Sequence, residues 1–379
     1  MKLHRLLLAT CFLYLTPARG QTLIYSLTYA ETRASSEARF ASMPLMPGQR
    51  TQQQNLDLLR NTRKTEIYSL SLADGTRTLL FSDEGMNLEI KAPGTAAGGG
   101  KAYAAGTWRE YRSTPTPGVY SDEAIYELPL DRSNHYRKIA PATANQPPAI
   151  LSPQSNKALV PAFVNGKFMV EIYSIPDWKL LHSWDLMQLV KDSCGGCTPV
   201  GYGWLADGKR VFVNLTVVGD EDDTADKPGA YFFSEEGISL GAVPAEFAVL
   251  QVPGYVHPNF IERHILGQMP DGRCIFLDYA AKQGSPGKPE PFLVLSSPDV
   301  KLGKAFPLHF SIGEVFMSPS SKSIAYLEDR HRPDYRTEVH LWVRNLESGA
   351  EKEVFSVPPP PLPNSPEPNV TLRLLGWMN

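Results

Sequence analysis

The sequence predicts an all-β fold, a single six-bladed β-propeller with four-stranded blades. Three observations predict it: a β-hairpin pattern that occurs six times, a second hairpin pattern ahead of most copies, and a spacing close to the ~40–50 residues of one blade. The clearest copy is 66–81, EIYSLSLADGTRTLLF, where two alternating apolar runs flank an Asp74-Gly75 turn. Alternation is typical of half-buried strands, and Asp-Gly is a strong hairpin signal. The other copies of this outer hairpin are 124–139, 171–184, 230–243, 291–306 and 338–355.

The second pattern is an inner hairpin: an apolar strand, a polar turn with a basic residue near its end, and another apolar strand. An inner hairpin followed by an outer one gives the four strands of a blade. The copies of the inner hairpin are 149–163, 202–215, 265–279 and 314–328. In blade two, the Gly/Ala-rich stretch 93–100 replaces the usual inner turn, and the first strand of blade five is placed only loosely.

The two ends of the chain complete blade one. Residues 22–31 read as a strand with no strand before it, and 372–379 match the start of an inner hairpin, with Gly376-Trp377 parallel to Gly203-Trp204. We therefore expect 372–379 to pair with 22–31 and close the ring, which protects the sheet edges that an open array would expose.

Two segments fall outside the repeats. Residues 32–64 read as an insertion in blade one, with a short helix within 49–63. Residues 357–368 contain four successive prolines, which cannot join a strand ladder. This segment is interpreted as a rigid spacer, and the alternative is a ligand for a proline-reading domain.

Residues 1–20 have the layout of a signal peptide: Lys2 and Arg5, an apolar run from 6 to 15, and small residues near the cleavage point at Gly20/Gln21. The alternatives are a buried core strand or a lipoprotein signal ending at Cys11. The signal-peptide interpretation leaves 21–379 as one propeller domain, exported to the periplasm or secreted.

Charge and hydropathy restrict the classes of partner that the chain can bind. Removal of Lys2, Arg5 and Arg19 leaves 34 basic and 40 acidic side chains, a net charge of −6. Nucleic acid is therefore disfavoured, because neutralising phosphates requires clustered Lys and Arg. No later segment reads as a membrane span. We expect a soluble monomer without a cofactor.

Three cysteines follow the signal segment. Cys194-Gly-Gly-Cys197 predicts a local disulfide in an oxidising compartment, with reduced thiols, a metal site or a redox dithiol as alternatives. Cys274, in an apolar strand, is expected to be buried.

The repeats resemble those of the TolB-type propeller family. The closest matches are the turn from Ser318 to Lys322 followed by Ile324-Ala325-Tyr326, and 206–212, ADGKRVF. The resemblance covers most of 22–379 and implies the propeller fold. It says little about function, because such propellers serve as binding platforms, enzyme covers and catalytic domains.

Candidate binding residues lie in the loops that join the second and third strands of the blades. Loops on a rigid scaffold commonly carry binding sites, and these are long. They cover 31–65, 109–123, 219–229, 280–289 and 329–337. Two of them combine aromatic and basic residues, which suits stacking and carboxylate recognition. The two clusters are Trp108, Arg109, Tyr111 and Arg112, and Arg330, His331, Arg332, Tyr335 and Arg336.

For both clusters the alternative is ordinary surface ion pairing. The acidic residues within 220–226 do not match a calcium loop and are interpreted as a solvated charged loop, so no metal site is assigned. The leading hypothesis is a non-catalytic exported propeller that binds a protein, a peptide or an envelope component, with no catalytic residue. The alternative is a propeller hydrolase or lyase that acts on a glycan or a peptide.

Overall fold

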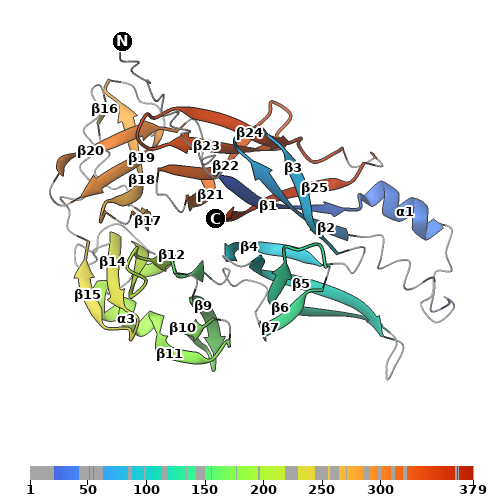
Figure 1. Cartoon of the computed structure of the whole chain (residues 1–379), viewed down its shortest axis with the longest axis horizontal. Helices are drawn as coiled ribbons and strands as arrows, with labels where there is room; N and C mark the ends of the chain where they lie inside the picture. Colours follow the sequence, from blue (N-terminus) through green and yellow to red (C-terminus); the bar gives the residue numbers. More distant parts are fainter. Residues whose placement is uncertain are drawn as a thin grey trace, which may run out of the picture.

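The structure is a computed structural model in which six antiparallel sheets follow one another round a ring in chain order (Figure 1). This is the predicted six-bladed propeller. The residues described are 21–41, 51, 54, 63–83, 88–97, 100–112, 118–133, 135–141, 150–154, 156–175, 177–194, 197–217, 229–243, 255–256, 264–269, 271–284, 290–297, 300–308, 312–318, 322–362, 365 and 367–378. The predicted signal peptide and the acidic residues 220–226 lie outside them.

Each blade is given from its innermost to its outermost strand. Blade one is β25 (Asn369–Met378), β1 (Thr22–Ala30), β2 (Arg63–Ser71) and β3 (Arg77–Ser82). Blade two is β4 (Glu89–Ala97), β5 (Lys101–Arg112), β6 (Gly118–Pro129) and β7 (Arg137–Pro141). Blade three is β8 (Ile150–Leu151), β9 (Lys157–Val164), β10 (Lys167–Ser174) and β11 (Leu180–Asp185).

Blade four is β12 (Cys197–Trp204), β13 (Arg210–Val217), β14 (Gly229–Ser234) and β15 (Ser239–Ala242). Blade five is β16 (Tyr255–Val256) with β17 (His264–Gln268), then β18 (Cys274–Lys282), β19 (Glu290–Ser297) and β20 (Val300–Pro307). Blade six is β21 (Ile312–Met317), β22 (Ser323–His331), β23 (Thr337–Asn345) and β24 (Glu351–Val357).

The hydrophobic core lies between the blades. Strand β1 shows why: Leu23 and Tyr25 pack against blade six, whereas Ile24, on the opposite face, packs against blade two. A strand buried on both faces reads as a continuous apolar run, as β1 does. Each pair of neighbouring blades shares one apolar cluster among the described residues, and the cluster between blades two and three is the smallest.

Ring closure by the chain ends is confirmed. Strand β25 pairs with β1 from Thr22 opposite Met378 to Ala30 opposite Asn369, with a bulge at Ile24/Tyr25. The Trp377 indole N–H donates to the carbonyl oxygen of Phe316 on β21, at 2.9 Å. Closure therefore adds a bond to the preceding blade as well as a complete fourth strand.

The predicted parallel between the two Gly-Trp pairs is present in space. The Trp204 indole N–H donates to the carbonyl oxygen of Ile150 on β8, at 2.8 Å, and Ile150 lies on the innermost strand of the preceding blade, as Phe316 does. Gly203 is required because a Cβ there would lie 2.7 Å from the ring of Phe212. The same Gly-Trp device thus joins blade three to four and blade six to one.

Two inner edges differ from the regular pattern. In blade two, 93–97 belong to β4, so the expectation that 93–100 replaces the turn is wrong for most of that stretch. Its ladder to β5 shifts register twice, between Ile90 and Ala92 and between Ala92 and Thr95, and the second shift contains Pro93, which cannot donate to the ladder. In blade five, β17 and β16 pair with successive halves of β18, which explains why the sequence placed this strand only loosely.

Two helices that the structure describes in full lie between strands. Helix α1 (Arg33–Ala41) follows β1, and the Thr32 hydroxyl accepts from the Ser35 amide at its start. Helix α3 (Leu186–Cys194) was not predicted, and it buries Leu186 and Val190 between blades three and four. Neither helix, at nine residues each, approaches the length and apolarity of a membrane span.

The helix predicted within 49–63 lies mostly outside the described residues. Thr51 and Gln54 exchange hydrogen bonds: the Thr51 amide donates to Gln54 Oε1 at 2.9 Å, and the Gln54 amide donates to Thr51 Oγ1 at 3.1 Å. This reciprocal pair is a capping box, the usual start of a helix.

Candidate functional site

The second predicted cluster lies at the tip of the β22–β23 hairpin. The two strands extend further than expected, with Arg330 opposite Glu338 and His331 opposite Thr337, so the predicted loop 329–337 shortens to 332–336. We call residues 332–336 the Tyr335 tip. Tyr335 is 94% exposed, the highest value among the large apolar and aromatic side chains that the structure describes.

The backbone of the Tyr335 tip is held by its own hydrogen bonds. The Arg332 amide donates to the Arg336 carbonyl at 2.8 Å, and the Tyr335 amide donates to the Arg332 carbonyl at 3.0 Å. Tyr335 has a φ of 63°, a left-handed conformation that a bulky residue adopts at a cost. A fixed turn therefore presents an aromatic ring to solvent.

Every arginine of this cluster is paired with a carboxylate. Arg330 Nη2 lies 3.1 Å from Glu328 Oε2, and its guanidinium lies 5.3 Å from the centroid of the Trp342 ring. Arg332 forms an ion pair with Glu338, and Arg336 Nη2 lies 2.7 Å from Asp334 Oδ2. The hydrogen bond from Arg336 lowers the pKa of Asp334. The arginines thus form surface ion pairs, as the alternative interpretation expects, and these pairs hold the hairpin together.

The Pro-rich segment passes beside the Tyr335 tip. Residues 358–362 form no strand, and Arg336 Nη1 donates to the Pro360 carbonyl at 3.2 Å. The carbonyl of Ser365 accepts from the Thr32 hydroxyl at 2.7 Å, so the segment runs from the tip to the start of α1. This rim therefore brings blade six, the Pro-rich segment and the blade-one insertion together.

The first predicted cluster is placed on strands. Trp108, Arg109, Tyr111 and Arg112 lie on β5, and pairing with β6 continues to Arg112 opposite Gly118. The expectation of a loop over 109–123 is therefore wrong, because the two strands continue outward as a long hairpin (Figure 1). Blades two and six each pack against blade one, so the two clusters lie on blades that are not direct neighbours.

The cysteines agree in part with expectation. Cys197 is disulfide-bonded, and Cys274 is free and buried, with a pKa raised to about 11 by that burial. Cys194 is the last residue of α3, and its side chain is outside the described part of the chain. The Cys194–Cys197 pairing therefore stays a prediction.

Buried carboxylates bear on the catalytic alternative, which expects such groups to converge. Three of them, one each in blades one, two and six, are instead ion-paired within their own blades. The pairs are Glu66 with Lys64 at 2.5 Å, Glu127 with Lys101 at 3.1 Å, and Glu328 with Arg330 at 3.1 Å. Burial alone would raise the pKa values of Glu66 and Glu127, but the hydrogen bonds from Lys64 and Lys101 and their other partners lower both.

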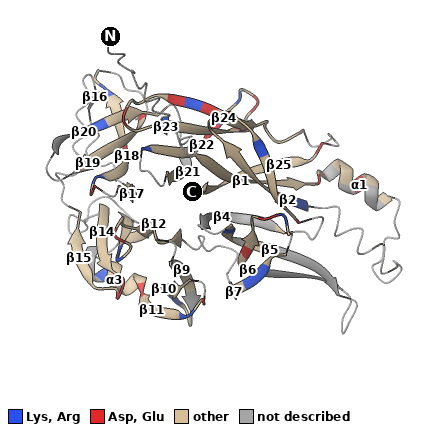
Figure 2. Cartoon of the chain, in the orientation of Figure 1, with Lys and Arg blue, Asp and Glu red and all other residues tan. Residues whose placement is uncertain are grey.

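Charge is mixed on the outermost strand of blade six. Figure 2 shows basic and acidic residues interleaved on β24, where Glu351, Lys352 and Glu353 are consecutive. Opposite charges on neighbouring strands form local pairs of the kind described above. Strand β24 therefore presents no single sign of charge to a partner.

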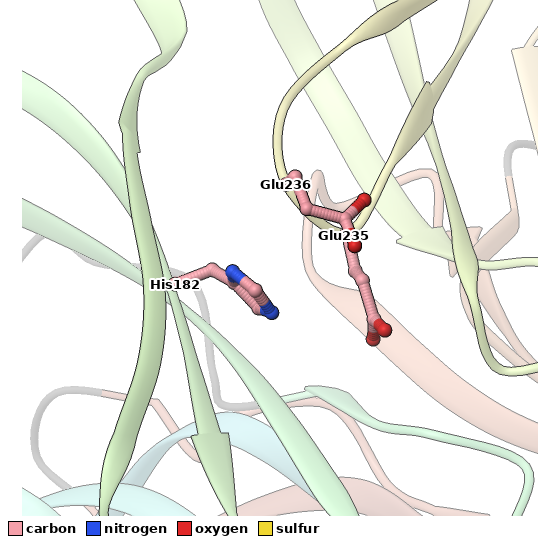
Figure 3. Close-up of side chains that lie close together, drawn as sticks. All are labelled: His182, Glu235 and Glu236. Atoms are coloured by element: carbon pink, nitrogen blue, oxygen red, sulfur yellow. The ribbon is translucent and has the colours of Figure 1, made fainter.

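Sequence reasoning missed one group of side chains that could coordinate a metal ion. His182, on β11, faces Glu235 and Glu236, which lie in the turn between β14 and β15 (Figure 3). The signal was present only in combination, because Glu235-Glu236-Gly237 and His182 occur in the outer hairpins of consecutive blades. Knowing the packing of blade three on blade four is necessary to bring them together.

Comparison with known proteins yields likenesses of fold. No family model matches the sequence, and no curated protein matches it. TolB from Acinetobacter baumannii is similar in structure, with a TM-score of 0.49, 10% identity, and coverage of 93% of this chain and 67% of that one. A TolB-type protein from Agrobacterium tumefaciens has a TM-score of 0.44, 11% identity, and coverage of 94% and 99%. The oligogalacturonate lyase of Vibrio parahaemolyticus has a TM-score of 0.40, 8% identity, and coverage of 76% and 83%. The chain is a six-bladed β-propeller, similar in fold to these TolB structures.

Proposed function

We propose that this chain is an exported, non-catalytic propeller that binds a protein or peptide partner at the rim carrying the Tyr335 tip. The observation that carries the proposal is the 94% exposure of Tyr335 in a fixed left-handed turn. An exposed tyrosine on a rigid support loses little conformational entropy on binding, and aromatic side chains are enriched among residues that dominate interfaces.

The conformation of Tyr335 supports a role in binding. Glycine adopts a φ of this sign without strain, so folding alone favours glycine at position 335. A tyrosine there costs stability and exposes an apolar ring, and strain of this kind concentrates at functional sites. The tyrosine therefore supplies something that the fold does not require.

The surroundings of the tip indicate the kind of partner. Arg332 and Arg336 are neutralised by Glu338 and Asp334, so the tip offers an aromatic ring within a charge-balanced rim. Leu362, 60% exposed, lies two residues beyond the Pro360 carbonyl that Arg336 binds. This composition fits a polypeptide surface with apolar side chains.

The experiment places a photo-crosslinking phenylalanine analogue at position 335 and irradiates cells of the source organism. We expect one adduct, identified by mass spectrometry. The matched control carries the probe at Ser348, in the exposed β23–β24 turn at the opposite end of the same blade. Equal adducts from both positions, or none at 335, would refute the assignment of the rim.

Stability measurements separate binding from folding. Tyr335→Gly is expected to raise the free energy of unfolding by up to about 1 kcal/mol, because it relieves the left-handed strain, and to abolish capture of the crosslinked partner. Tyr335→Ala keeps the strain and should change stability by less than about 0.5 kcal/mol. A substantial loss of stability in Tyr335→Gly would show that the ring supports the fold.

A further inference from the structure

His182, Glu235 and Glu236 form a cluster at the seam between blades three and four. One possible ligand atom from each residue lies within 4.8 Å of the others. Figure 3 shows the imidazole directed across the seam towards the two carboxylates, which come from the other blade. His182 and Glu235 are partly buried and Glu236 is exposed, so the cluster is open to solvent on one side.

Packing fixes the distance between the two sides of the seam. Gly237 follows the two glutamates with a φ of +83°, and a Cβ there would lie 2.7 Å from Trp184. Trp184 is two residues from His182 on β11, and its ring packs against that of Phe233 on β14 in a tilted arrangement with ring centroids 5.9 Å apart. The glutamate turn is thus pressed against the strand that carries the histidine.

The backbone of the glutamate turn is also constrained. The Ser234 amide donates to the Ile238 carbonyl at 2.9 Å, the Gly237 amide to the Ser234 carbonyl at 3.0 Å, and the Glu235 amide to the Lys209 carbonyl at 3.1 Å. The position of each glutamate Cα is therefore set before any ligand arrives. Only side-chain torsions have to adjust on binding.

The charges of the cluster are only partly balanced by the protein. Lys157, on β9, forms an ion pair with Glu235. Glu236 follows Glu235 in the same turn and is exposed. Within the described residues one ammonium group lies beside two carboxylates, so the cluster keeps a formal negative charge that favours a bound cation.

We propose that this cluster binds one divalent transition-metal ion of the zinc class through a His182 ring nitrogen and one oxygen each from Glu235 and Glu236. An imidazole nitrogen with carboxylate oxygens suits Zn²⁺ and its neighbours, whereas Ca²⁺ and Mg²⁺ prefer oxygen alone. Three protein ligands leave a fourth position for water. Ligand atoms ~2.0–2.2 Å from such an ion require the cluster to contract, and the glutamate torsions allow this. The site joins two blades and is independent of the partner-binding rim.

Lys157 acts in this proposal as the competitor of the metal. Its ammonium group holds Glu235 in the metal-free protein and must release one carboxylate oxygen when the ion binds. Removing the ammonium group should therefore tighten metal binding, whereas removing a ligand should weaken it. Few sites of adventitious surface binding would respond in opposite directions to these two changes.

The test titrates ZnCl₂ into the full chain, purified without a polyhistidine tag, by isothermal calorimetry, and repeats the titration with Co²⁺ by visible absorption. We expect one ion per chain, a visible Co²⁺ band of low coordination number, and a thermal unfolding midpoint that rises with metal concentration. His182→Ala and Glu236→Gln should each raise the Kd by at least ~10-fold, since even changes outside the ligand set cost this much. Lys157→Met should lower it several-fold.

His135→Ala, which removes an exposed histidine from the β6–β7 turn, is the matched control and should leave the titration unchanged. A Kd and Co²⁺ spectrum that are the same in the parent, His182→Ala and Glu236→Gln would overturn the proposal, as would the absence of binding by the parent. If His182→Ala fails to fold, the exposed Glu236→Gln variant decides the question alone.

Discussion

Blade one and blade four have the same inner edge, and they differ in what holds that edge in place. In both, a Gly-Trp pair on the innermost strand donates an indole hydrogen bond to the innermost strand of the preceding blade. In blade four, β12 begins at the disulfide-bonded Cys197 and continues into β13 through the short turn 205–209. In blade one, β25 follows the Pro-rich segment and meets β1 from the other end of the chain.

The outer turns of the two blades differ in how closely they pack against the neighbouring blade. The Asp74-Gly75 turn of blade one is exposed, and a Cβ on Gly75 would meet nothing within 4 Å. The Glu235-Glu236-Gly237 turn of blade four is pressed against Trp184 of blade three. Position in the ring, more than local sequence, thus decides which parts of a repeated unit tolerate change.

Truncation of the two tryptophans tests the inner edges and should have the largest effect. Trp204→Ala and Trp377→Ala are each expected to cost about 3–5 kcal/mol in urea unfolding, because each empties a buried site and removes an indole bond. Only Trp377→Ala should release a strand, since nothing ties Met378 to β1 covalently. Limited proteolysis should therefore cut within 358–368 in that variant first.

The control for this pair is Trp377→Phe, which keeps most of the apolar area and loses the indole hydrogen bond, at a cost of about 1 kcal/mol. Equal protease sensitivity of Trp204→Ala and Trp377→Ala would show that the covalent turn and disulfide of blade four give its inner strand no advantage.

The outer turns are compared by Gly237→Ala and Gly75→Ala. Both glycines have positive φ values, +83° and +73°, so both variants carry a backbone cost of about 1–2 kcal/mol. Gly237→Ala should lose a further 1–3 kcal/mol, roughly, because its methyl group displaces Trp184. Equal unfolding free energies for the two variants would contradict the close packing of the blade-four turn.

The disulfide at the start of β12 is a feature that β25 lacks among its described residues. If Cys197 pairs with Cys194, replacing both by serine should cost about 2 kcal/mol, the loop-entropy value for so short a ring. Mass spectrometry of the non-reduced, alkylated chain checks the pairing. Alkylation of both cysteines would exclude it, and a bond from Cys197 to another cysteine would correct it.

The smallest expected effect is on the pH dependence of stability. The pKa of Glu66, in blade one, is lowered because hydrogen bonds from Lys64 and Tyr68 outweigh its burial. A lowered pKa in the folded state stabilises the protein above the unfolded carboxyl pKa, and this contribution is lost as the pH falls through the folded value. Glu66→Gln should therefore cost less than about 1 kcal/mol at pH 7, and this cost should shrink progressively as the pH falls from 7 to 3. A cost that does not change between these pH values would show that the charge of Glu66 has no role.

Much of the fold could be predicted because a propeller repeats. Alternation and turn residues located both hairpins of the blades, and Gly376-Trp377 identified the closing strand by its likeness to Gly203-Trp204. Prediction failed where a segment depends on its neighbours: α3 is amphipathic only with respect to the seam of blades three and four, and the β5–β6 hairpin continues beyond the apolar pattern.

The candidate site was less predictable for the same reason. The second cluster was found because Arg330, Arg332, Tyr335 and Arg336 are close in sequence, but their carboxylate partners could be assigned only once the register of β22 and β23 was known. His182 and Glu235 are 53 positions apart, and no local pattern relates them. Contacts between blades depend on ring geometry, which a single repeat does not encode.

The pairing of Thr22 with Met378 also means that the propeller could be built from a circularly permuted chain. A linker as long as the turn 205–209 would join the two ends and convert blade one into a blade of the ordinary kind. New ends could then be opened at the two-residue turn Asn165-Gly166, whose positive φ values make it a tight hairpin between β9 and β10. A circularly permuted propeller of this kind would keep every strand neighbour and move the point of closure from blade one to blade three.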